Sequence, residues 1–104
     1  MTYDHNQIFK QVKSMLNRRP GCPLFEIAKK LGIERHNIER AVKSELSIKF
    51  HEFKKRIRLE RAIHLLKEGH SVREVSLALG YRSPRAFSRF FKTQTGRAPG
   101  LFLS

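Results

Sequence analysis

The stretch EIAKKLGIERHNIERAVK, residues 26–43, is repeated as EVSLALGYRSPRAFSRFFK at residues 74–92. The two copies match at Leu31 and Leu79 and at the glycine that follows each. Each copy predicts a short helix, a turn at glycine and a second helix with basic residues on its polar side. This is the pattern of a helix-turn-helix unit, so we expect two such units in the chain.

Matching positions continue along both copies. Before the glycines the pairs are Glu26/Glu74, Ile27/Val75 and Ala28/Ser76. After one extra residue in the second copy the pairs are Ile38/Phe87, Arg40/Arg89, Ala41/Phe90, Val42/Phe91 and Lys43/Lys92. Apolar pairs therefore recur at helical spacing, and a basic side chain stands at the same place in each second helix.

Composition favours a polyanionic partner. The 104 residues carry 22 Lys and Arg against 9 Asp and Glu, a formal charge of +13. That excess is more than solubility requires, and together with two helix-turn-helix units it points to double-stranded DNA. A length of 104 residues fits one domain, or two small lobes that share one element.

Several functional classes lack a basis in the sequence. Cys22 is the only cysteine, which excludes an internal disulfide and fits a reducing cytoplasm. The five histidines show no metal-ligand spacing, so we expect no metal site and no cofactor. Without a phosphate loop, a carboxylate pair or a nucleophile beside a base, we expect no enzyme. No stretch has the length of a membrane span, so membrane is not an expected partner.

The expected fold is all-α, with about seven helices and no strand. Helices are predicted at about 4–18, 23–31, 35–45, 48–68, 72–79 and 84–95, with a short closing turn from Pro99. Asp4, Ser71 and Ser83 are the expected N-caps, and glycines end several of the helices. The buried face of the fifth helix is expected to be Val75, Ala78 and Leu79, and the apolar residues 101–103 are expected to close the second lobe.

The whole pattern resembles the DNA-binding domain of the AraC/XylS family of bacterial transcription regulators. The resemblance covers about residues 8–102 and is most specific from Gly80-Tyr81 through Phe87-Ser88-Arg89 to Gly96 and Pro99. It implies two helix-turn-helix lobes, residues 4–46 and 70–104, joined by a linking helix at 47–69, all within one domain of 1–104. It also implies that both recognition helices enter successive major-groove segments of one duplex.

The resemblance further implies activation of promoters by contact with RNA polymerase. The chain has the size of the family's stand-alone members, and as it stands we expect a monomer on DNA in the cytoplasm, associated with the nucleoid. Two alternatives stay open. One is a DNA-binding piece of a larger ligand-responsive regulator of this family, and the other is a basic protein that binds RNA or anionic membrane through charge alone.

The sequence departs from the family at two places. Glu34 stands where the first recognition helix often begins with serine, which weakens the cap and puts an acid near the DNA. Leu101-Phe102-Leu103 replaces the Tyr-Arg pair often found after the proline.

Arg89 and Arg40 are the first candidates for DNA contacts. An arginine side chain can donate two parallel hydrogen bonds to O6 and N7 of guanine, or it can bind a phosphate through its charge. Near the start of the second recognition helix, Arg85 and Pro84 fall where such helices meet bases, although Pro84 also serves simply to start the helix. Glu39 is the unusual candidate, because it is acidic. Its carboxylate either accepts a hydrogen bond from N4 of cytosine or repels the phosphates of the backbone.

The full set of expected DNA contacts includes residues for which an ordinary solvated side chain is the alternative. It comprises Arg35, His36, Glu39, Arg40, Lys43, Lys54, Lys55, Ser83, Pro84, Arg85, Ser88, Arg89 and Lys92. Lys54 and Lys55 are the expected backbone contacts of the linking helix. Lys49, Arg56 and Arg61 belong to the same basic run, whose simplest interpretation is a solvated face. Arg58 matches a position of the resembled family, which implies a structural role with a bond across the interface between the lobes.

Overall fold

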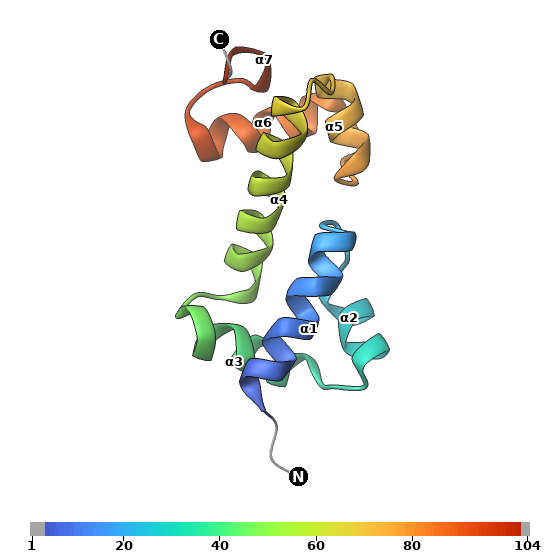
Figure 1. Cartoon of the computed structure of the whole chain (residues 1–104), viewed down its shortest axis with the longest axis vertical. Helices are drawn as coiled ribbons and strands as arrows, with labels where there is room; N and C mark the ends of the chain where they lie inside the picture. The colour runs from blue at the N-terminus through green and yellow to red at the C-terminus, as the bar shows by residue number, and fades with distance from the viewer. Residues whose placement is uncertain (1–3, 103–104) are drawn as a thin grey trace. The chain divides into compact units, whose positions relative to one another are not determined.

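The computed structural model describes residues 4–102, which form seven α-helices and no strand (Figure 1). The helices are α1 (His5–Arg18), α2 (Leu24–Leu31), α3 (Arg35–Leu46), α4 (Phe50–Lys67), α5 (Val72–Ala78), α6 (Pro84–Thr95) and α7 (Pro99–Phe102). The predicted all-α architecture is therefore confirmed. Within the described residues, no helix has the length and hydrophobicity needed to cross a membrane.

The chain divides into two compact units, residues 1–57 and 58–104. The division falls inside α4, which gives its first residues to one unit and its later residues to the other. Phe50, Phe53 and Ile57 are buried in the first core, and Ala62 and Leu66 are buried in the second. This agrees with the apolar stripe of the sequence, which changes helical face near Leu59.

In the first unit α3 packs against α1 and α2 (Figure 1). The apolar positions of α1 recur at intervals of four, and Val12 and Leu16 are fully buried between the helices. From α3, Ile38, Ala41 and Val42 complete the same core. Because these residues occupy one side of α3, its other side is left to solvent.

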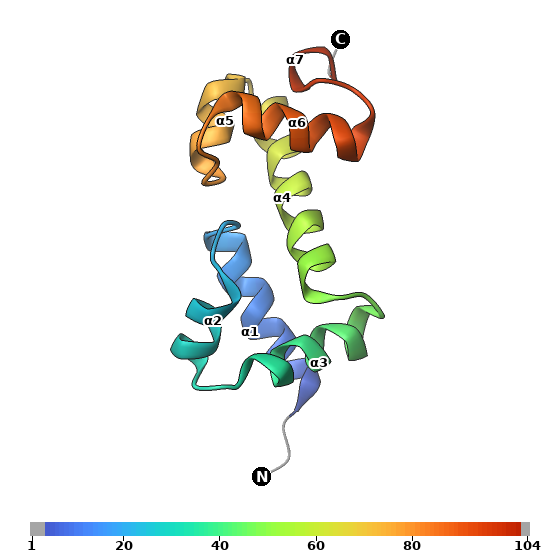
Figure 2. The same ribbon diagram turned by 180° about the vertical axis from the view of Figure 1, so that it is seen from behind.

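In the second unit α6 packs against α5 and α7 (Figure 2). Phe87 and Phe91 of α6 are fully buried, with ring centroids 5.8 Å apart. The Phe102 ring of α7 meets Phe91 edge-on, with centroids 5.1 Å apart, a favoured geometry for aromatic pairs. Aromatic packing thus fixes which side of α6 faces inward.

Side-chain caps define where three helices begin. The Asp4 carboxylate accepts the backbone N–H groups of Asn6 and Gln7, as the sequence predicts for α1. Ser71 and Glu74 form a complete capping box at α5. The Ser83 hydroxyl oxygen accepts the backbone N–H of Ala86, with Pro84 in the first turn of α6.

The ends of α2, α3 and α6 lie in the left-handed backbone region. Gly32 ends α2 with φ of 66°, and Gly96 ends α6 with φ of 83°. Ser47 ends α3 with φ of 60°, a conformation that residues with a Cβ atom rarely adopt. The two glycine stops follow from the sequence, whereas the serine stop does not.

Two expectations about buried residues are wrong. Ala78 is exposed, and Ser76 is buried instead, because the Ser76 hydroxyl donates to the Arg73 carbonyl at 2.8 Å and so has a partner. Leu101 is 62% exposed, while Pro99 and Phe102 cover the second core. Leu103 lies outside the described residues.

Candidate nucleic-acid interface

The candidate residues of α3 occupy its solvent side. Arg35, His36, Glu39, Arg40 and Lys43 are all exposed, and the residues between them form the buried face. Because α3 is held by packing on one side only, these five side chains are available to a ligand on the other. The first unit therefore presents a helix whose exposed surface carries four basic or histidine side chains and two acids, Glu39 and, after the last candidate, Glu45.

The start of α3 holds the acid that the sequence places near the candidate interface. Glu34 is the N-cap residue, and its side chain makes no capping hydrogen bond. Its carboxylate instead lies 3.3 Å from Nε2 of His36. The expected weak cap is confirmed, and the Glu34 carboxylate is engaged with His36.

The candidate residues of α6 are likewise on its outer side. Arg85, Arg89 and Lys92 are exposed, Pro84 is exposed in the first turn, and Ser88 is half-buried. The Ser83 oxygen is engaged as the helix cap, but its hydroxyl hydrogen remains available as a donor. Arg40 and Arg89, which match in the repeat, are both exposed on the helix that follows a turn at glycine.

The two lysines expected to be backbone contacts on α4 have partners inside the first unit. Nζ of Lys54 donates to the Gly21 carbonyl at 3.4 Å, and the side chain is half-buried. Nζ of Lys55 lies 3.7 Å from Oε1 of Glu52. A contact from either lysine to a phosphate would compete with these interactions.

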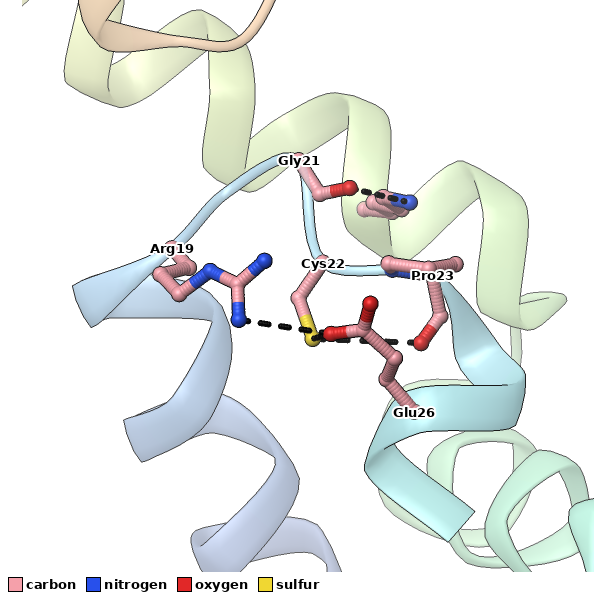
Figure 3. A network of polar contacts seen from close by, with 6 residues as sticks. Arg19, Gly21, Cys22, Pro23 and Glu26 are labelled. Carbon is pink, nitrogen blue, oxygen red and sulfur yellow. Dashed lines mark hydrogen bonds and ion pairs between the residues drawn. The ribbon is translucent and has the colours of Figure 1, made fainter. Parts of the chain in front are cut away.

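A polar network surrounds Cys22 in the loop between α1 and α2 (Figure 3). Glu26 forms an ion pair with Arg19 at 3.3 Å, and its Oε2 lies 3.6 Å from Sγ of Cys22. Burial raises the pKa of the Cys22 thiol, and the neighbouring Glu26 raises it further. The thiol is thus kept protonated, which argues against a reactive cysteine.

Arg58 packs within the second unit. Its guanidinium carbon lies 5.2 Å from the centre of the Tyr81 ring, within the range of a cation–π contact. Burial raises the pKa of Tyr81, and the positive charge of Arg58 opposes that rise. The implied structural role of Arg58 agrees with this contact inside the second unit, whereas a bond across the interface between the lobes stays a prediction. Sequence alone does not identify Tyr81 as the partner.

The structure adds two basic residues next to the candidate set. Lys49 and Arg97 line hollows beside Lys43 and Lys92 respectively. The sequence indicates a solvated basic run around Lys49 and no role for Arg97. The available signal was position, since each follows a recognition helix by only a few residues. Within residues 4–102, no three His, Cys, Asp or Glu side chains gather to hold a metal ion.

Two exposed basic helices, each following a short helix and a turn at glycine, define a protein with a double helix-turn-helix. A family model described as "Helix-turn-helix domain" matches residues 27–104. The chain belongs to the AraC-type helix-turn-helix family of DNA-binding transcription regulators.

Two curated relatives and one solved structure illustrate this likeness. The probable transcription factor PqrA of Proteus vulgaris is 30% identical over 98 residues, covering 93% of this chain and 80% of PqrA. The Msm operon regulatory protein of Streptococcus mutans is 30% identical over 95 residues, covering 88% of this chain. The chain spans only 34% of the length of that relative.

The solved structure is the DNA-binding domain of AdpA, a global transcriptional factor, in complex with a target DNA. The likeness has a TM-score of 0.74 at 22% identity, and covers 97% of this chain and 90% of the AdpA chain. At this identity the likeness establishes the fold, and the bound DNA is a property of AdpA.

Proposed function

We propose that this chain binds one asymmetric site on double-stranded DNA as a monomer, with α3 and α6 in successive major-groove segments. The observation that carries the proposal is the pair Arg40 and Arg89, which match in the repeat and are exposed on the outer side of those helices. Arginine is the residue most often used to read guanine in the major groove.

The two helices carry different side chains at their exposed starts. His36 and Glu39 occupy α3, whereas Pro84 and Arg85 occupy α6. Unlike surfaces favour unlike base sequences, so one chain reads both segments without a palindrome. We assign base contacts to the exposed residues near the start and middle of each helix, and phosphate contacts to Lys43, Ser88, Lys92, Lys54 and Lys55.

The functional division that we propose is a first lobe at 4–46, a linking helix at 47–69 and a second lobe at 70–104. We further propose that the bound protein activates transcription through contact with RNA polymerase, acting in the cytoplasm at the nucleoid. Family membership supports this part of the proposal, since the relatives are regulators of transcription.

A second candidate is that this chain is the DNA-binding part of a larger regulator with a separate control region. The observation in its favour is that the chain spans only about a third of the Msm operon regulatory protein. The length of the natural reading frame distinguishes this candidate from a stand-alone regulator.

The proposal is tested by selecting bound duplexes from random DNA and footprinting the protein on the selected sequence. We expect one protected, non-palindromic site and strong preference over competitor RNA and anionic vesicles. Equal binding to all three ligands, with no protected site, would show that binding rests on charge alone.

A further inference from the structure

The two candidate recognition helices end in the same way. The backbone N–H of Ser47 donates to the Lys43 carbonyl at 2.8 Å, and that of Gly96 donates to the Lys92 carbonyl at 2.7 Å. Both end residues have positive φ, 60° and 83°. Lys43 and Lys92 match in the repeat, so the chain leaves each helix by the same turn beside the same kind of residue.

A hollow lies beside this turn in each unit. The first, of about 490 Å³, is lined by Arg40, Lys43, Lys49 and His51, with Leu24 and Phe50 as apolar walls and Glu39 as its acid. The second, of about 410 Å³, is lined by Lys92 and Arg97, with Gly96, Ala98 and Leu101. In both, a lysine of the helix faces the same space as a basic residue from the segment that follows.

The cations of these hollows are not neutralised by the protein. Among residues 4–102, no ion pair joins the side chain of Lys43, Lys49, Lys92 or Arg97 to a carboxylate. Few acids lie near these cations. Glu39 is the acid that lines the first hollow, and Glu52 is paired there with His51 at 3.3 Å. The described lining of the second hollow contains no acid. Each hollow is therefore suited to an anion.

We propose that each hollow binds one phosphate of the DNA backbone, Lys43 with Lys49 in the first unit and Lys92 with Arg97 in the second. The inference rests on the proposed DNA binding and assigns Lys49 and Arg97 as phosphate contacts that fix the position of each recognition helix. Phosphate contacts of this kind orient a protein on the duplex and carry no sequence information.

The first measurement is the salt dependence of binding to random-sequence duplex, which requires no specific site. We expect the double variants Lys43→Ala/Lys49→Ala and Lys92→Ala/Arg97→Ala each to reduce the slope of log affinity against log salt by about 0.9, the value for one phosphate. Lys49→Ala and Arg97→Ala alone should each reduce the slope by part of that amount, because the lysine of the helix still contacts the phosphate. Lys13→Ala and Lys67→Ala remove the same charge from exposed positions of α1 and α4 that line neither hollow, and we expect them to leave the slope nearly unchanged.

The second measurement locates the phosphates on the selected site by replacing single linkages with neutral methylphosphonate. We expect one linkage whose neutralisation weakens binding of the wild-type protein more than binding of Lys49→Ala. A different linkage should show the same difference between the wild-type protein and Arg97→Ala. Circular dichroism spectra matching wild type show that the variants fold.

Slopes equal to those of the control variants, or linkages that weaken wild type and variants alike, would overturn the inference. Either result leaves selection of a protected site intact, so the proposed function survives it. Failure of the proposed function has a different signature, since wild-type protein would then show no preference for any duplex.

Discussion

At the residue scale, Ser47 and Gly96 occupy equivalent turns with different side chains. A left-handed conformation costs a residue with a Cβ atom about 1–2 kcal/mol. Glycine avoids this cost but loses more conformational entropy on folding, which offsets part of the gain in stability. We therefore expect Ser47→Gly to stabilise the first unit by roughly 0.5–1 kcal/mol.

Gly96→Ala is the matched change in the opposite direction. No atom lies within 4 Å of a Cβ added at Gly96, so its cost of about 1–2 kcal/mol comes from the backbone alone. Urea unfolding of the two variants checks both signs. Equal midpoints for Ser47→Gly and wild type would show that another interaction of Ser47 compensates for its conformation.

The Cys22 thiol has a testable dependence on pH. Its pKa is raised above the ordinary value of 9.0, so the folded protein holds this proton more tightly than the unfolded chain. Its contribution to stability is complete below pH 9.0 and is lost as the pH rises through the folded pKa. We expect iodoacetamide to label the folded protein much more slowly than the unfolded protein at pH 8.

Two substitutions in the same ion pair should change this labelling in opposite directions. Glu26→Gln removes a group that raises the Cys22 pKa and should speed labelling, whereas Arg19→Gln removes a cation that lowers it and should slow labelling. Faster labelling of both variants would mean that loosening of the loop, not the thiol pKa, controls the rate.

At the scale of elements, the fold was predictable wherever local chemistry and apolar spacing agree. Ser71 and Ser83 start helices because their hydroxyls bind backbone N–H groups, and Gly96 stops one because it tolerates positive φ. The end of α3 was not predictable in this way, since Ser47 takes a conformation that its side chain disfavours.

The candidate interface was predictable as exposed helix faces but not as contacts between elements. The repeat correctly placed Arg40 and Arg89 on outer sides, because Ile38 and Phe87 mark the buried sides. The engagement of Lys54 with Gly21 joins residues 33 positions apart, and no spacing in the sequence predicts it. Which of the candidates contact DNA stays a prediction.

The packing of α6 gives a prediction for the second unit. Phe87 is fully buried beside Phe91 and Tyr81, so Phe87→Ala should cost roughly 3–5 kcal/mol, enough to unfold that unit. Phe25→Ala is the control, because Phe25 is 62% exposed and its loss should cost less than about 0.5 kcal/mol.

Amide NMR spectra measure the effect of Phe87→Ala unit by unit. We expect signals of α5, α6 and α7 to lose dispersion while those of α1 and α3, which belong to a separate core, keep theirs. Uniform loss across the chain would show that the two cores unfold together.

At the scale of the whole molecule, the central question is how one chain uses two different recognition helices. In the proposed complex, the second helix-turn-helix unit removes the need for a symmetric partner, since both half-site contacts would come from one polypeptide. We also expect a chain with a formal charge of +13 to bind any duplex through its phosphates. Specificity must therefore be measured apart from affinity, by comparing selected and random DNA at one salt concentration.

Arg40→Ala and Arg89→Ala provide that measurement. Each should cost about 1–3 kcal/mol on the selected site and flatten the preference at one or two base pairs. Because successive major-groove segments are about one helical turn apart, the two flattened positions should be separated by roughly 10 base pairs. Sedimentation of the complex should show one chain per duplex. Loss of preference at the same base pairs in both variants, or two chains per site, would contradict reading by a single chain and favour a dimer with one recognition helix from each copy.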